Sequence, residues 1–511
     1  MSRFLRNTFV IFVVLLVGAA LASAQDAVSL VEFMDGTFGV QGVRPDGWMN
    51  VQPGIHVRGG SGRDVTLLAV QAAPLSVQSL WPALLPQFGL QSPPESIGAL
   101  TTEAFEWQLY QFEVTQAGIT VAVDLALAEQ DGTTYIVLVQ SDASEQQALY
   151  DQVFMPVVES LKPFVEDTAS LPYTVEEVAF ANGEVTLAGT LTLPEGDGPH
   201  PAVVLMTGSG PQDRDEQVAG FAIFRTIADY LTRQGSAVLR YDDRGVGQSS
   251  GEWASAGLAE FAADGKAAVA YLQTRDDINA EQVGVLGHSI GGALAAILGA
   301  DPESGLAFIV SMAGPGVDGQ VTLVEQNKII LAQQGATPEQ IDSQIAFLEA
   351  SFPLIEARDW EAYEDLMDDT LVEQWDLLTD EQRESTGLSS AEEFAELSAA
   401  NGLATVSNEE FITLMAYDPA PDWEKTTVPV LALFGEFDLQ VPPVLHAPAL
   451  EAALEASGNS DVTVVVIEGA NHLFQATETG AIEEYAQLPP EFVPDFLPTI
   501  SNWILERVSD S

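Results

Sequence analysis

Apolar and polar residues follow a regular rhythm in the second half of the chain. From about residue 173, short apolar runs alternate with segments whose apolar positions recur at helical spacing. Apolar strands separated by helices indicate an α/β fold, with a doubly wound and mostly parallel sheet covered on both faces. The expected strands are 175–181, 187–193, 202–208, 237–243, 282–287, 307–314, 428–435 and 462–469, and the expected helices are 221–235, 259–274, 290–300, 444–457 and 492–508.

Two features interrupt this rhythm. Asn182-Gly183, between the first two expected strands, predicts a β-hairpin. Residues 317–416 contain no strand-like run and have a helical, acidic pattern. Because such sheets bind ligands at the carboxyl ends of their strands, this insertion between two strands is expected to form a helical cap over a site.

Residues 25–165 predict a small α+β domain that precedes the α/β domain. Its expected strands include 118–129 and 133–141, and a helix is expected over 144–164. The polar segment 165–172 reads as a linker, so the second domain is expected over 166–511. With its early 46-DGW-48 and late helix, the first domain resembles PsbP-like domains, and its role stays open.

Residues 1–24 have the pattern of a secretory signal peptide. Arg3 and Arg6 precede an apolar run from Phe9 to Ala22, and small residues follow at 22–24. The expected product is a soluble protein that is secreted or periplasmic, with no stable membrane insertion after cleavage. Anchoring to the membrane by an uncleaved signal is the alternative.

Composition narrows the possible chemistry. The chain has no cysteine, which excludes thiol chemistry, and its five histidines are scattered, so neither a metal nor a cofactor is implied. With 75 acidic and 18 basic residues, the net charge of −57 would repel nucleic acid and anionic membranes. A saline or acidic habitat and drift in composition both remain open as causes. The oligomeric state is not readable.

A serine between glycines marks the point where one expected strand becomes a helix. In 287-GHSIG-291, this turn would project the Ser289 hydroxyl clear of the backbone, as a nucleophile requires. The helix that follows directs its N-terminal amides toward the same point.

The base and the acid that would assist Ser289 are identified by their positions after the expected strands. His472 comes directly after the last expected strand, whereas the other four histidines fall in the first domain, at a strand start, in the turn itself or in a helix. Asp438 follows the preceding strand, so both side chains lie at carboxyl ends of neighbouring strands. Glu436 is the alternative acid.

An oxyanion would need two backbone amides. The glycine-rich loop 207-TGSGPQDRD-215 follows the expected strand 202–208, and it lacks the Lys-Ser/Thr of a phosphate loop. We assign the oxyanion hole to the amides of Ser209 and Ile290.

Residues 173–511 resemble α/β-hydrolases of the capped carboxylesterase branch, with a cap similar to that of serine aminopeptidases. The resemblance rests on the segments GSGPQDRD, DDRGVGQS, GHSIGG, GEFDLQVP and NHLFQ, and on the order Ser289, Asp438, His472. It implies that Asp243 and Arg244 support the site without acting as catalysts. Relatives usually carry His-Gly where this chain has Thr207-Gly208, which leaves the orientation of that loop open.

These features predict a secreted serine hydrolase that cleaves small carboxylic esters. A serine peptidase or amidase of the aminopeptidase type is the alternative, because the same triad serves both reactions. A non-catalytic binding protein with a vestigial site is the third possibility.

Overall fold

The computed structural model describes residues 28–35, 38–52, 54–58, 66–73, 76–88, 90–116, 119–130, 132–164, 170–379, 383, 390–391, 394, 402–403 and 405–508. The predicted signal peptide, residues 1–24, and most of the predicted linker lie outside these ranges. The chain divides into two compact units, one ending at Asp167 and the other beginning at Thr168, with residues 378–390 grouped with the first. Within the described ranges, no helix combines the length and the apolar character that a membrane crossing requires.

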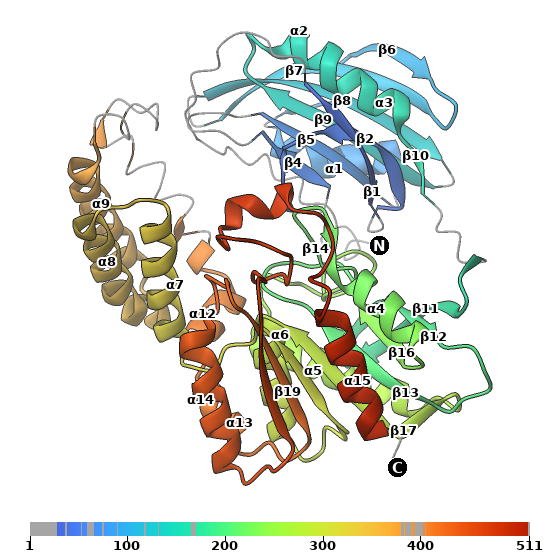
Figure 1. Cartoon of the computed structure of the whole chain (residues 1–511). Helices are drawn as coiled ribbons and strands as arrows, with labels where there is room; N and C mark the ends of the chain where they lie inside the picture. Colours follow the sequence, from blue (N-terminus) through green and yellow to red (C-terminus); the bar gives the residue numbers. More distant parts are fainter. Residues whose placement is uncertain are drawn as a thin grey trace. The chain divides into compact units, whose positions relative to one another are not determined.

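The described residues of the first unit form two antiparallel sheets (Figure 1). The larger sheet has the order β3-β4-β5-β9-β8-β7-β6, and the smaller has the order β1-β2-β10. The strands are β1 Leu30–Asp35, β2 Val40–Pro45, β3 Met49–Gln52, β4 Ile55–Val57, β5 Leu67–Ala73, β6 Ser96–Thr101, β7 Glu106–Gln116, β8 Ile119–Gln130, β9 Thr133–Ser141 and β10 Lys162–Pro163. Helix α1 spans Val77–Gln87.

The helix expected over 144–164 is shorter than predicted and is interrupted. It comprises α2 (Gln146–Leu149), a π-helical turn (Tyr150–Phe154) and α3 (Met155–Ser160). Pro156 lacks the N–H that would continue the regular α-helical hydrogen bonds, which accounts for an irregular turn before it. Residues 162–163 instead pair with β2, so the prediction of helix to residue 164 was wrong.

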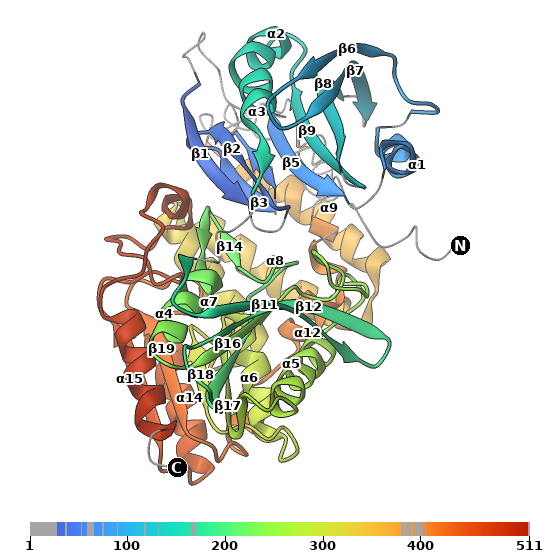
Figure 2. The same cartoon turned by 90° about the vertical axis from the view of Figure 1, so that its right-hand side faces the viewer.

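The described residues of the second unit form an eight-stranded sheet with the order β11-β12-β16-β13-β17-β18-β19-β20 (Figure 2). The first two strands form the predicted antiparallel hairpin, and the strands from β16 to β20 are parallel. This confirms the doubly wound, mostly parallel α/β fold. The strands are β11 Thr174–Asn182, β12 Val185–Leu193, β13 His200–Met206, β16 Ala237–Tyr241, β17 Ile278–His288, β18 Ile309–Met312, β19 Val430–Gly435 and β20 Val462–Ile467.

Helices cover both faces of this sheet. Alternate residues of β13 point to opposite sides, with Val204 in one core cluster and Val203 in the other. One cluster packs α5 (Leu258–Gln273), α6 (Ile290–Ala300) and α14 (Pro443–Ala456), and the other packs α4 (Ile223–Arg233) and α15 (Phe496–Val508). Helix α4 begins two residues later than predicted, because Phe221–Ala222 (β15) pairs with Gln217–Val218 (β14).

The segment between β18 and β19 is helical, as the sequence predicts. It contains α7 (Gly319–Gln333), α8 (Pro338–Ala357), α9 (Trp360–Leu377), α12 (Glu409–Met415) and the short α13 (Ala420–Trp423). Asp318 caps α7, and Thr337 and Gln340 form a capping box at the start of α8. The helices enclose a small core of their own around Phe352, and α8 and α9 lie side by side (Figure 1).

Candidate functional site

Ser289 occupies the turn between β17 and α6. Its φ of 54° and ψ of −115° are strained for a residue with a side chain, and its amide donates to the carbonyl of Met312 at 2.8 Å. A Cβ at Gly287 would overlap the backbone of Gly291, and one at Gly291 would overlap the carbonyl of Met206. The two glycines therefore allow strand and helix to approach at this turn. The half-buried Ser289 hydroxyl makes no hydrogen bond to another residue of the described part of the chain.

His472 and Asp438 are joined by a hydrogen bond. His472 Nδ1 lies 2.8 Å from Asp438 Oδ2, and both side chains are buried. Asp438 Oδ1 accepts the amides of Gln440 and Val441, each at 2.8 Å. Burial acts to raise the pKa of Asp438, but His472 and these amides outweigh it and hold the pKa below its ordinary value. The carboxylate therefore stays ionised, and Nε2 is the ring nitrogen of His472 left to exchange a proton.

The alternative acid, Glu436, has a different partner. Its side chain is exposed, and its Oε2 accepts the amide of Gly469 at 2.9 Å. The structure thus pairs His472 with Asp438, one of the two acids that the sequence left open.

In the loop after β13, some backbone amides have a hydrogen-bond acceptor and one has none among the described residues. The Gly208 amide donates to Glu216 Oε1 at 2.7 Å, and the Gly210 amide donates to both carboxylate oxygens of Glu410 at 3.1 Å. Between them, the Ser209 amide has no acceptor among the described residues. The same holds for Ile290, the first residue of α6, whose amide has no acceptor within its own helix. Both amides assigned to an oxyanion hole are therefore available to a ligand.

Two buried acids near this loop escaped the sequence analysis. Glu216 contacts His288 Nδ1 at 2.8 Å, and Glu410 reaches the loop from α12. Burial raises the pKa of Glu410 to about 7, although the Gly210 amide opposes this shift. With 75 acidic residues in the chain, no sequence signal separates these two from the acids on the surface.

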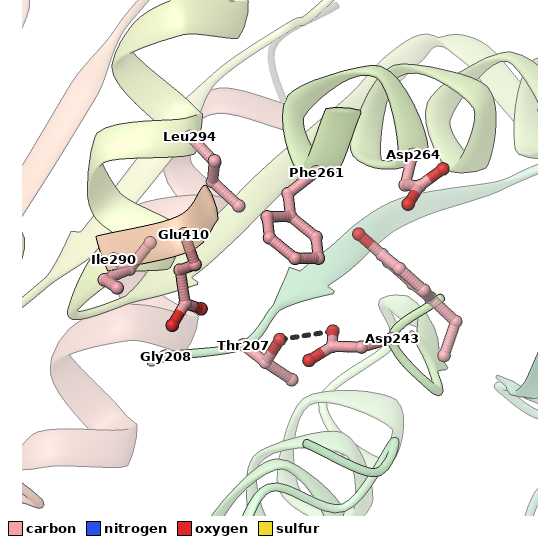
Figure 3. Close-up of a pocket in the computed structure, with 9 residues that line it drawn as sticks. Thr207, Gly208, Asp243, Phe261, Asp264, Ile290, Leu294 and Glu410 are labelled. Atoms are coloured by element: carbon pink, nitrogen blue, oxygen red, sulfur yellow. Dashed lines mark hydrogen bonds between the residues drawn. The ribbon is translucent and has the colours of Figure 1, made fainter. Parts of the chain in front are cut away.

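Glu410 lines a small, partly open cavity of about 10 Å³, near the size of one water molecule (Figure 3). Asp243 lies on another side of this cavity and accepts the Thr207 hydroxyl at 2.7 Å. Burial raises the pKa of Asp243 well above its ordinary value, and the charges of Glu410 and Glu216 add to the shift. The cavity is lined by Thr207, Gly208, Tyr241, Asp243, Phe261, Asp264, Ile290, Leu294 and Glu410.

Arg244 holds the loop after β16 to α5. Its Nε and Nη2 donate to the carboxylate of Asp264 at 2.7 and 2.8 Å. Asp243 therefore contacts the loop after β13, and Arg244 contacts α5.

Comparison with known proteins gives matches over the second unit. The model of the alpha/beta hydrolase fold family matches residues 201–479, a range that includes Ser289, Asp438 and His472. Esterase EstD of Thermotoga maritima is 28% identical over 312 residues, which is 60% of this chain and 63% of that protein, less than two thirds of its length.

Solved structures also resemble part of the chain. An esterase of Pyrococcus furiosus is 15% identical, with a TM-score of 0.39 over 68% of this chain and 95% of its own. Proline iminopeptidase of Mycobacterium smegmatis is 18% identical, with a TM-score of 0.40 over 66% of this chain and all of its own. Since the family model covers more than half of the chain, this protein belongs to the α/β-hydrolase fold family.

Proposed function

We propose that this protein is a serine hydrolase that cleaves carboxylic esters through an acyl-enzyme on Ser289. The observation that carries the proposal is the hydrogen bond between His472 and Asp438. The backbone carbonyl of His472 also contacts the side chain of His288, the residue before Ser289. The esterase name of the relative in Thermotoga maritima supports ester cleavage over other hydrolytic reactions.

In this mechanism, Nε2 of His472 takes the proton of the Ser289 hydroxyl, and the oxygen attacks the acyl carbonyl carbon. The oxyanion of the tetrahedral intermediate accepts hydrogen bonds from the amides of Ser209 and Ile290. The alcohol leaves with the proton from His472. Water, deprotonated by the same histidine, then attacks the acyl-enzyme and releases the acid. Asp438 stabilises the imidazolium form of His472 in both steps.

We assign the helices between β18 and β19 to a cap that selects the substrate. Glu410, in α12, reaches the loop that carries Ser209, so above about pH 7, where Glu410 is ionised, a second negative charge would be unfavourable there. This favours small neutral esters over anionic ones. The same proposal includes a signal peptide at 1–24, export from the cytoplasm and an independent domain at 25–165.

Labelling with a fluorophosphonate tests the nucleophile. The folded protein should gain one phosphonyl group on Ser289, located by peptide mass mapping, and the Ser289→Ala variant should gain none. No modification of the folded protein would support a binding protein with a vestigial site and would overturn the proposal.

A substrate panel tests the reaction. p-Nitrophenyl esters of graded acyl length should be hydrolysed with a higher kcat/KM than aminoacyl p-nitroanilides. The opposite ranking, with Ser289 still labelled, would replace the esterase by a peptidase or amidase of the aminopeptidase type.

A further inference from the structure

The imidazole of His288 lies between two acceptors. Its Nδ1 contacts Glu216 Oε1 at 2.8 Å, and its Nε2 contacts the backbone carbonyl of His472 at 3.1 Å. A carbonyl oxygen has no proton to give, so Nε2 must carry a hydrogen. His288 and Glu216 are only 3% and 1% exposed, so water does not compete for these contacts.

One further proton lies between His288 Nδ1 and Glu216 Oε1. Burial lowers the pKa of His288, but the charge and hydrogen bond of Glu216 outweigh burial, and the His472 carbonyl and Asp438 add to the effect, so the pKa is raised. This shift favours the imidazolium form of His288 beside the Glu216 carboxylate. The two charges cancel, which matters because the His472 ring lies 5.0 Å from the His288 ring and must itself accept a proton during catalysis.

The same oxygen of Glu216 also accepts a hydrogen bond from the loop after β13, called the oxyanion loop below because it carries Ser209. Glu216 Oε1 accepts the Gly208 amide at 2.7 Å, and a Cβ at Gly208 would come within 2.9 Å of that oxygen, so a larger residue at this position would displace the Glu216 carboxylate. Glu216 also has a φ of 46°, a strained value for a residue with a side chain. Such strain persists only where the surrounding contacts hold the residue in place.

We propose that Glu216 and His288 are a pair of positioning residues that hold three parts of the active site together. Gly208 precedes Ser209, His288 precedes Ser289, and the carbonyl that accepts from His288 belongs to His472. The pair thus links the oxyanion loop, the nucleophile turn and the loop of the base through buried hydrogen bonds. The inference rests on the proposed function, because it assigns these residues to the reaction at Ser289.

Nuclear magnetic resonance of the protein without substrate tests the protonation state of His288. With ¹⁵N-labelled histidine, the His288 signals are assigned by their absence in His288→Gln. Both ring nitrogens of His288 should carry a proton at neutral pH, and one should lose it in Glu216→Gln, because a neutral amide no longer stabilises the imidazolium. An unprotonated ring nitrogen in the wild-type protein would overturn the inference. This measurement needs neither substrate nor catalytic activity.

Steady-state kinetics tests whether Glu216 and His288 position the catalytic groups. Glu216→Gln and His288→Gln should each lower kcat by about 10- to 100-fold, with KM changed much less, since misplacing catalytic groups by about 1 Å has effects of this size. The double variant should be no worse than the worse single variant, because the two residues act as one unit. His200→Gln, at the start of β13 and the opposite end of the strands, is the matched control and should keep wild-type kcat.

The outcomes separate this inference from the proposed function. If Ser289 is labelled by the fluorophosphonate and Glu216→Gln keeps wild-type kcat, the positioning role fails while the esterase proposal stands. If Ser289→Ala retains activity, the proposed function fails. A fall in kcat that is matched by an equal loss of folded protein in circular dichroism would also count against positioning.

Discussion

Asp438 and His472 lie 34 positions apart, yet Asp438 Oδ2 and His472 Nδ1 are 2.8 Å apart. Each residue follows the carboxyl end of a strand, β19 for Asp438 and β20 for His472, and these two strands are parallel neighbours. The register of the sheet therefore brings the acid to the histidine. Since Asp438 also accepts two backbone amides, its orientation is fixed independently of His472.

Replacing Asp438 by Asn should lower kcat by about 10³- to 10⁴-fold, because the amide no longer selects the tautomer or stabilises the imidazolium of His472. Steady-state ester hydrolysis measures the loss. Glu436→Gln is the matched control, since the Glu436 side chain is exposed and, among the described residues, bonds only to the Gly469 amide. A larger effect at Glu436 than at Asp438 would reverse the assignment of the acid.

At position 289, alanine and glycine should both abolish hydrolysis but differ in stability. The φ of 54° is unfavourable for any residue with a Cβ, whereas glycine adopts it freely. Ser289→Gly should therefore be more stable than Ser289→Ala by about 1 kcal/mol. Urea denaturation of the two variants gives this difference. Equal stability would mean that the turn is relaxed in solution.

The oxyanion assignment to Ser209 concerns its amide, so its side chain should be dispensable. Ser209→Ala should keep kcat within about twofold, whereas Ser209→Pro, which removes the N–H, should lower kcat by about 10²- to 10³-fold. Circular dichroism of both variants controls for folding. Loss of activity in the alanine variant would show that the hydroxyl takes part.

Glu410 should make stability depend on pH. Because its pKa rises from 4.5 to about 7 on folding, the folded protein holds this proton more tightly than the unfolded chain. The free energy of unfolding should therefore fall as pH rises between those values. Glu410→Gln removes this contribution and should be more stable than the wild type at pH 8 by about 2–3 kcal/mol, measured by urea denaturation.

Glu409, the residue before Glu410, supplies the control for this prediction. Glu409 is paired with Arg358, and this pairing lowers its pKa, so Glu409→Gln should show no such gain at pH 8. A Glu410→Gln variant with the wild-type pH dependence would mean that folding does not raise the pKa of Glu410.

Gly291 should tolerate no side chain. A Cβ there would overlap the carbonyls of Met206 and Thr207, so Gly291→Ala should lose about 2 kcal/mol or more of stability together with activity. Gly98→Ala is the control, because nothing lies within 4 Å of a Cβ at that position. An active and stable Gly291→Ala variant would contradict the close packing of α6 on β13.

The sequence predicted the central fold well, because its signals are local. Apolar runs of strand length predicted the eight strands of the large sheet of the second unit to within a few residues. The helix expected over 144–164 shows the limit of periodicity. Its apolar spacing is helical throughout, but the pattern does not report the hydrogen bond that Pro156 removes or the pairing of residues 162–163 with β2.

For the proposed site, Ser289, Asp438 and His472 could be predicted from the chain alone, because each follows a strand whose end lies at the same edge of a parallel sheet. The choice between Asp438 and Glu436 required the structure, since it depends on which side chain turns toward His472. Glu216, Glu410 and the contacts of His288 were also beyond the sequence. Their positions result from folded loops and from the helical insertion, which bring residues as far apart as 210 and 410 into contact. Burial raises the pKa of Glu410, and contact with Glu216 raises the pKa of His288 against the effect of burial, so both shifts depend on the tertiary structure.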